Sequence, residues 1–153
     1  MVRNAVTAPI LAICLFLFAG PVLGQWIDIK DPSELRELHS DRSFIATTED
    51  GKPWNTFVHK SDGHGTASAK GTDWTRDWVV KGDQVCINEH LGPSWEGNWL
   101  CRTVQRNATI PDQYRSISVD EPGAKTIIAI PKVLYYKVRP APPYRKADGK
   151  AVG

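Results

Sequence analysis

Histidines and carboxylates in two short segments are the residues best suited to chemistry in this chain. His59 and His64 flank a four-residue turn, so in a hairpin closed by that turn they would lie opposite each other. Two imidazoles at this spacing could hold a metal, with Asp62 or His90 as a third ligand. No cysteine or carboxylate stands at a ligand spacing on the same strand, which favours ordinary exposed turn histidines. We therefore predict no metal site and no cofactor.

A second group of polar residues brackets the loop after residue 88. Glu89, His90 and Glu96 could form the carboxylate and imidazole pair of a small secreted hydrolase. The sequence contains no Gly-x-Ser-x-Gly elbow to supply a nucleophile. Acidic residues at loop ends usually meet solvent, so this hydrolase is the alternative prediction, and a protein without catalytic residues is the first.

The six tryptophans favour binding over catalysis. Indoles that line a cavity or its rim offer apolar surface with one hydrogen-bond donor each, which suits a small apolar ligand or a protein partner. Trp95 lies in a glycine-containing loop, so we expect it to be exposed at the opening of the fold. Core packing is the alternative role for each indole. We predict Trp95, Trp99 and Trp74 as ligand-binding residues.

The segment that must position these side chains runs from residue 74 to residue 104 and carries a cysteine on each of its two arms. If the arms form a β-hairpin, pairing Cys86 with Cys101 gives a register in which the numbers of opposite residues sum to 187. Ile87 then faces Leu100, and both faces of the hairpin carry apolar or aromatic pairs. The pattern predicts a β-hairpin with a Cys86–Cys101 disulfide.

The first 24 residues have the pattern of a cleaved secretory signal peptide. Arg3 precedes an apolar stretch over residues 8–18, and the small residue Gly24 precedes the expected cleavage site. The apolar stretch is too short for a comfortable membrane span. An exported chain enters an oxidising compartment, where two remaining cysteines usually pair. We therefore predict a periplasmic or secreted protein with no stable membrane anchor.

The periodicity of the remaining chain is that of short strands with turns between them. Asp31-Pro32 predicts the start of a short helix that ends near His39. Alternating or apolar segments predict strands at 43–48, 54–59, 65–70, 74–80, the two arms of the hairpin, and 114–119. The last apolar segments are 126–130 and 133–138, and Pro131 between them either ends one strand or makes a bulge on an edge. The sequence therefore predicts an all-β fold with one short N-terminal helix, an antiparallel meander or small barrel of about seven or eight strands.

Charge and proline divide the chain after the expected signal peptide. Residues 25–138 hold 14 lysines and arginines against 16 acidic residues and are expected to form one domain. Residues 139–153 hold 4 against 1 and are expected to form a disordered, basic, proline-rich tail. Because nucleic-acid binding needs basic residues clustered on one face of a fold, we predict no nucleic-acid partner.

The order of these elements resembles a bacterial family of small exported lipocalin-like β-domains of unassigned function. The residues that carry the resemblance are Leu35-Arg36-Glu37-Leu38, Phe57, Asp62-Gly63, the run from Trp78 to Asp83, Cys86 and Cys101. They cover roughly residues 33–104. The resemblance implies a lipocalin-like barrel and a location in the cell envelope, and it implies no catalytic residue.

Together these patterns predict an exported, non-enzymatic binding module. Its ligand would be a small apolar molecule or a protein of the envelope or extracellular space. Inhibition of a protease by an exposed loop belongs to the same class of function. The alternative is the small secreted hydrolase described above.

Overall fold

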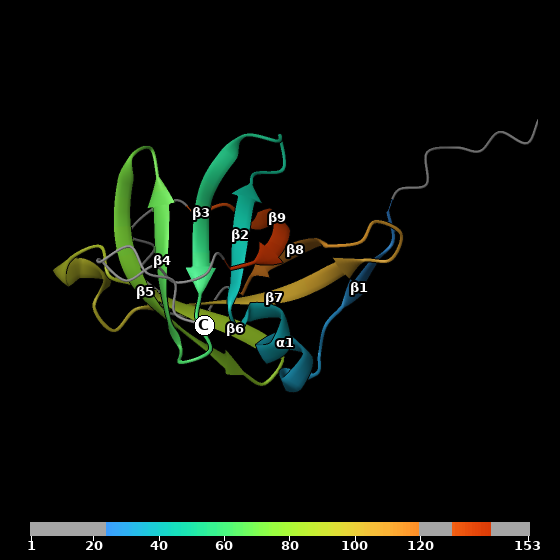
Figure 1. Cartoon of the computed structure of the whole chain (residues 1–153), viewed down its shortest axis with the longest axis horizontal. Coiled ribbons are helices and arrows are strands. Elements are labelled where there is room, and N and C mark those ends of the chain that lie inside the picture. Colours follow the sequence, from blue (N-terminus) through green and yellow to red (C-terminus); the bar gives the residue numbers. More distant parts are fainter. Residues whose placement is uncertain (1–23, 120–129, 142–153) are drawn as a thin grey trace, which may run out of the picture.

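The computed structural model describes residues 24–119 and 130–141 of the 153-residue chain. This part of the chain is mostly β-structure. Its elements are β1 (Trp26–Asp28), α1 (Pro32–His39), β2 (Arg42–Thr47), β3 (Pro53–His59), β4 (His64–Ala69), β5 (Thr72–Lys81), β6 (Gln84–Glu89), the 3-10 helix η1 (Pro93–Trp95), β7 (Trp99–Asn107), β8 (Gln113–Ser118) and β9 (Val133–Pro140) (Figure 1).

Strands β2 to β9 form a closed antiparallel barrel. Each strand pairs with the next one along the chain, and β9 closes the ring by pairing with β2. Strand β1 lies outside this ring and pairs with β7. It shares one edge of β7 with β6: β6 pairs with residues 99–103, and β1 pairs with residues 105–107. The predicted all-β fold with one short helix and a small antiparallel barrel is confirmed.

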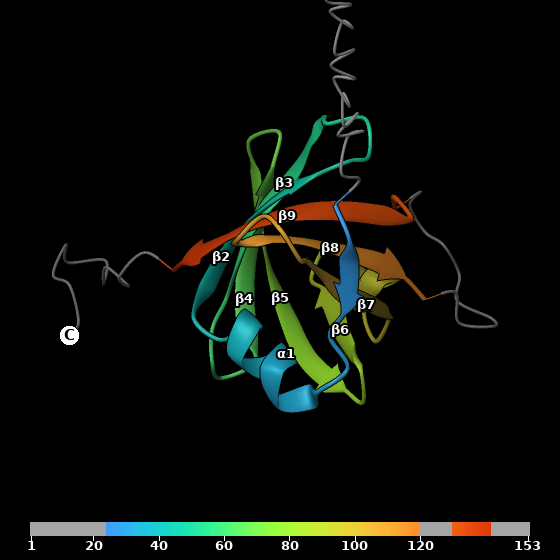
Figure 2. The same ribbon diagram turned by 90° about the vertical axis from the view of Figure 1, so that its right-hand side faces the viewer.

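The helix α1 lies against one end of the barrel (Figure 2). Its start is set by Asp31, whose carboxylate accepts the backbone N–H of Ser33 at 2.8 Å, and by Pro32 at the first helical position. Leu35, with 0 % of its surface exposed, packs in a cluster with Trp78 and Val80 of β5. α1 therefore closes this end of the barrel. No helix within the described ranges is long and apolar enough to cross a membrane.

Inward and outward side chains alternate along every strand, as the pleat requires. On β5 the inward residues are Arg76, Trp78 and Val80, and on β2 they include Phe44 and Ala46. Two apolar clusters result, one beneath α1 and one built from β2, β3, β4 and β9. The interior also holds polar side chains, which are described below.

The hairpin of β6 and β7 has the register that the cysteine pair predicts. Cys86 pairs with Cys101, Ile87 with Leu100 and Asn88 with Trp99, so the residue numbers sum to 187. Cys86 and Cys101 form a disulfide. Because Ile87 and Leu100 point inward, the disulfide crosses the outer face of the barrel.

Some segments differ from the expected boundaries. Strand β1 was not expected, and β9 extends through Arg139 and Pro140, which pair with β2, so the domain boundary expected at residue 138 is too early. Of the strand expected at 126–130, only Ile130 is described, and it lies outside the strands. The expected signal peptide, apart from Gly24, and residues 142–153 of the expected tail lie outside the described residues.

The disulfide is testable by mass and by stability. Reduction should add two hydrogens to the intact mass of the native protein, and a peptide map should link the segments that hold Cys86 and Cys101. Because the bridge joins positions 15 residues apart, its loss in the double variant Cys86→Ala/Cys101→Ala should lower the free energy of unfolding by roughly 3 kcal/mol. Finding both thiols free in native protein would contradict the pairing.

Candidate functional site

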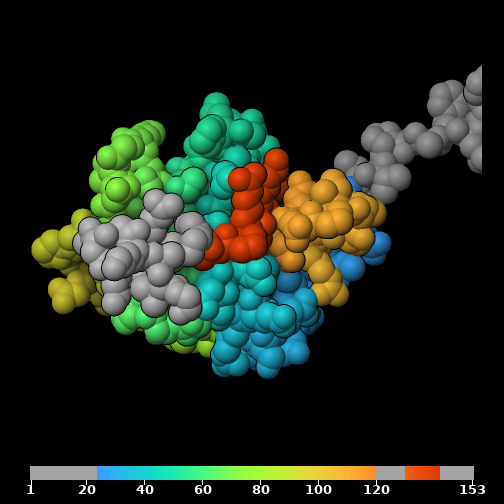
Figure 3. All heavy atoms as spheres, viewed as in Figure 1, coloured from blue at the N-terminus to red at the C-terminus, as the bar shows by residue number. Residues whose placement is uncertain are grey.

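The barrel contains a cavity of about 670 Å³. Its rim includes Asp50 and Lys52 from the β2–β3 connection and Pro53 at the start of β3, together with Lys70 from the β4–β5 turn. These two connections stand at the end of the barrel away from α1 (Figure 1), and in the space-filling view they form two projections with a notch between them (Figure 3). The cavity therefore belongs to the end opposite the helix.

The wall of the cavity is largely apolar. Aromatic and aliphatic side chains from five of the eight barrel strands line it: Trp54, Phe57, Trp74, Ile87, Leu100, Leu134 and Tyr136. Phe57 and Tyr136 meet edge to face, with ring centroids 5.7 Å apart. Such a wall can hold an apolar molecule by dispersion and by excluding water.

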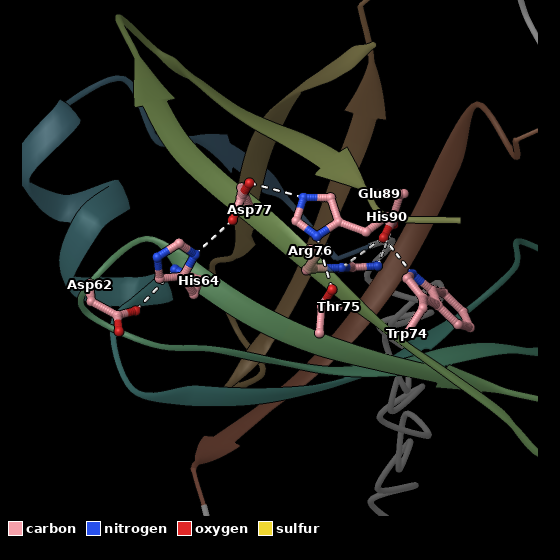
Figure 4. A network of polar contacts seen from close by, with 8 residues as sticks. All are labelled: Asp62, His64, Trp74, Thr75, Arg76, Asp77, Glu89 and His90. Atoms are coloured by element: carbon pink, nitrogen blue, oxygen red, sulfur yellow. Dashed lines mark hydrogen bonds and ion pairs between the residues drawn. The ribbon is translucent and has the colours of Figure 1, made fainter. Parts of the chain in front are cut away.

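Two arginines on the wall distinguish this interior from a plain apolar core. The first, Arg76 of β5, has 2 % of its surface exposed and pairs with Glu89 of β6 (Figure 4). Glu89 accepts from Arg76 Nε at 3.0 Å, from Arg76 Nη2 and from the indole N–H of Trp74 at 2.6 Å. Burial lowers the pKa of Arg76, and the neighbouring Glu89 carboxylate opposes this shift.

The second arginine, Arg102 of β7, has 6 % of its surface exposed and bonds only neutral oxygens. Its Nε donates to the hydroxyl of Ser116 at 2.6 Å, and Ser116 in turn shares a hydrogen bond of 2.5 Å with the Tyr136 hydroxyl. Its Nη2 donates to the carbonyl oxygens of Ser116, Pro131 and Lys132. Burial lowers the pKa of Arg102.

The three tryptophans predicted to bind a ligand do not all line the cavity. Trp74 and Trp95 both line the cavity, whereas Trp99 points outward and lies beneath the ammonium of Lys81, 5.1 Å from the ring centroid. The expected exposure of Trp95 is wrong, because only 7 % of its surface is exposed. The 3-10 turn η1 folds the indole inward instead of presenting it to solvent.

The three residues of the hydrolase alternative are not brought together. Glu89 lines the cavity and bonds Arg76 and Trp74, whereas His90 bonds Thr75 and Asp77. Glu96 is exposed after η1. The structure therefore does not form the predicted carboxylate and imidazole pair, because the end of β6 sends consecutive side chains to opposite faces.

Outside the barrel, Asp77 organises a polar network (Figure 4). Its carboxylate accepts from His64 Nδ1 at 2.7 Å and from His90 Nε2 at 2.9 Å, and His90 Nδ1 lies 2.9 Å from the hydroxyl of Thr75. Burial opposes a lower pKa for Asp77, but the two histidine hydrogen bonds outweigh it and lower the pKa. A hydroxyl, an imidazole and a carboxylate bonded in this order activate the nucleophile of many hydrolases. Here, however, Thr75 and Asp77 lie on the outer face of the barrel, so this network does not face the cavity.

The two histidines considered as a metal pair lie on opposite faces of the sheet. The turn closes at Lys60, whose N–H donates to the carbonyl of His64 at 2.8 Å, and His59 therefore pairs with Gly65. Gly63, with φ of +88°, permits this shorter turn. The expected opposition of His59 and His64 is wrong, and the described residues contain no group of three ligands suited to a metal.

His59 instead meets His39 of α1 in the interior beneath the cavity. Their Nδ1 atoms lie 3.0 Å apart, so one ring donates and the other accepts. His59 also stacks on Trp78, and its Nε2 is buried without a partner. Burial lowers the pKa of His39 to about 3 and that of His59 well below its ordinary value, and the charge of Arg76 lowers both further. Both rings are therefore neutral in the fold.

Arg76 and Arg102 were not singled out from the sequence, although a signal for each was present. Arg76 has the same alternation phase as Trp74 and Trp78, so it must point inward with them. The register of the cysteine hairpin places Arg102 opposite Val85, on the face of Ile87. Both arginines could have been predicted from one pattern, a charged residue at an inward position of a strand.

The inward position of Trp95 predicts a structural cost when the indole is removed. Trp95→Ala should lower the free energy of unfolding by roughly 3 kcal/mol, because a buried aromatic side chain is lost and a void remains. Urea denaturation followed by circular dichroism measures this. Trp99→Ala, which removes a half-buried indole from the outer face, is the matched control and should cost less. Equal stability of wild type and Trp95→Ala would contradict the burial.

The neutral histidine pair predicts loss of stability in acid. In the unfolded chain each imidazole takes up a proton as the pH falls below about 6.5, whereas the folded protein resists protonation. Stability from this source is full above that pH and should fall by about 2 kcal/mol per histidine between pH 7.5 and pH 5. The midpoints of urea denaturation at pH 7.5 and at pH 5 measure this loss of stability.

The control for this pH dependence is the double variant His39→Gln/His59→Gln. It removes both buried imidazoles and leaves the network of Asp77 in place. The contribution of the pair is therefore the difference between wild type and variant in how the free energy of unfolding changes with pH. An identical slope in the two proteins would contradict neutral burial of the histidines.

No family model, curated protein or solved structure matches this chain. Its resemblance to exported lipocalin-like β-domains therefore stays a prediction. The cavity and its two arginines are the features on which a function can be argued.

Proposed function

We propose that this protein is a non-enzymatic binding module that takes a small, mostly apolar ligand into the barrel. The observation that carries the proposal is the cavity of about 670 Å³ with its aromatic and aliphatic wall. Ligand sites in proteins typically measure about 300 to 1,000 Å³ and combine apolar walls with a few oriented polar groups. The cavity has both properties.

The rigidity of the surrounding barrel supports binding as the role of this space. Every strand that contributes to the wall is paired on both edges, so its inward side chains are held before a ligand arrives. A site formed in advance loses less conformational entropy when it binds. Trp54, Trp74 and Trp95 supply large apolar surfaces with few rotatable bonds.

We propose further that the protein acts outside the cytoplasm. The Cys86–Cys101 disulfide supports this, because such bonds persist in the periplasm and in extracellular space. The signal-peptide pattern of residues 1–24 supports the same conclusion. The ligand would then be a molecule that the barrel meets in the envelope or the medium.

Filling the cavity from one strand tests the proposal. Ala69→Trp places an indole at a position that lines the cavity, and it should weaken binding of the neutral fluorescent probe N-phenyl-1-naphthylamine by on the order of tenfold or more. Thr66→Trp adds the same side chain to the outer face of the same strand and is the matched control.

The measurement is the titrated rise of probe fluorescence, after circular dichroism has established that both variants are folded. The proposal expects wild type and Thr66→Trp to bind alike and Ala69→Trp to bind weakly. Equal binding by all three proteins would place the probe outside the cavity and contradict the proposal, as would a wild type that does not bind the probe.

A further inference from the structure

We infer that the ligand of this cavity is an amphipathic carboxylate whose head group binds Arg102. This inference rests on the proposed binding function and goes further by naming the chemical class. Its basis is the charge balance inside the barrel: a carboxylate neutralises the Arg76 guanidinium, whereas the described part of the chain places none beside Arg102.

Among the described residues, no carboxylate pairs with the buried cation Arg102. Its hydrogen bonds to the described residues all go to uncharged oxygens, namely one hydroxyl and three backbone carbonyls. Within residues 24–119 and 130–141 no carboxylate lies within ion-pair distance of it. A buried charge is costly unless it is paired. An anionic ligand would supply the missing charge.

Arg76 provides the internal comparison. It lies in the same barrel, and the paired carboxylate of Glu89 compensates its charge. The fold therefore neutralises a buried guanidinium where a carboxylate faces it across the neighbouring strand. At Arg102 the facing positions hold Val85 and Ser118 instead. Arg76 therefore belongs to a structural ion pair, whereas the guanidinium of Arg102 is open to a ligand.

The donors around Arg102 suit a carboxylate. Its Nη1 donates to none of the described residues, and both Arg102 and Tyr136 line the cavity. When the Ser116 hydroxyl donates to Tyr136, the phenol proton is left for a second acceptor. A carboxylate could accept from the guanidinium and the phenol together, in charge-assisted hydrogen bonds.

The charged side chains that line the cavity are also mostly cationic. The lining includes four cationic side chains, at positions 52, 70, 76 and 102, and two carboxylates, at positions 50 and 89. Lys52 pairs with Asp50 on the rim, which leaves Lys70 at the mouth and Arg102 inside. A cation at the entrance favours the approach of an anion.

A single negative charge fits this interior better than two. One uncompensated guanidinium matches a carboxylate, whereas the second charge of a phosphate monoester would be buried among aromatic side chains. The apolar wall then takes the hydrocarbon or aromatic body of the ligand. A medium-chain fatty acid has both parts.

The test compares three probes with the same ten-carbon chain: decanoate, 1-decanol and decylamine. Binding is measured at pH 7.5, where the carboxylate is ionised, by displacement of N-phenyl-1-naphthylamine from the folded protein. Decanoate should bind more tightly than decanol by on the order of tenfold, as expected for a charge-assisted contact. Decylamine should bind most weakly.

Arg102→Gln should remove the preference for decanoate while decanol binding changes little. Lys70→Gln, at the exposed mouth, is the control and should keep most of the preference. If Arg102→Gln does not fold, the comparison of decanoate with decanol on wild type decides the question, and Arg102→Lys, which keeps the charge, should retain a preference for decanoate.

The outcomes separate the two proposals. Equal binding of decanoate and decanol would overturn the carboxylate inference and leave the apolar cavity standing. Tighter binding of decylamine would overturn it as well. Failure of the neutral probe and of all three ten-carbon compounds to bind would overturn the proposed function together with the inference.

Discussion

Closure of the antiparallel barrel is the constraint on which the rest of the structure depends. The β2–β9 and β7–β8 ladders leave no open edge among the eight strands, and they force alternate residues of every strand into one interior. Inward positions are therefore fixed by register and not by side-chain polarity. This is why Arg76, Arg102 and His59 lie inside, where each must find partners.

The two ends of that interior are used differently. At the α1 end, Leu35, Trp78 and the neutral pair of His39 and His59 fill the space. Toward the other end, large aromatic residues leave a cavity instead of a packed core. A filled end gives stability, whereas an open end retains apolar surface and a buried charge that a ligand can satisfy. This division fits the proposed binding function, because one end of the barrel stabilises the fold and the other leaves space for a ligand.

The sequence predicted features set by local chemistry and missed those set by distant contacts. The cysteine register was readable because paired cysteines and apolar neighbours agree on both faces, and the helix because Asp31 and Pro32 mark its start. Strand β1 has three residues, which is too few to show a periodicity in the sequence, and it pairs with residues 77 to 81 positions away. The inward turn of Trp95 depends on the cavity beside it, and the shorter turn before His64 depends on a single φ angle at Gly63.

Nuclear magnetic resonance of the indole N–H groups during a decanoate titration tests the central claim most directly. Trp54, Trp74 and Trp95 line the cavity, whereas Trp99 lies on the outer face beneath Lys81. Each indole gives a separate signal, so the tryptophans report the position of the ligand. The account predicts that the three cavity signals shift together while that of Trp99 stays in place. A shift of Trp99 with the other three unchanged would place the ligand outside the barrel and contradict the account.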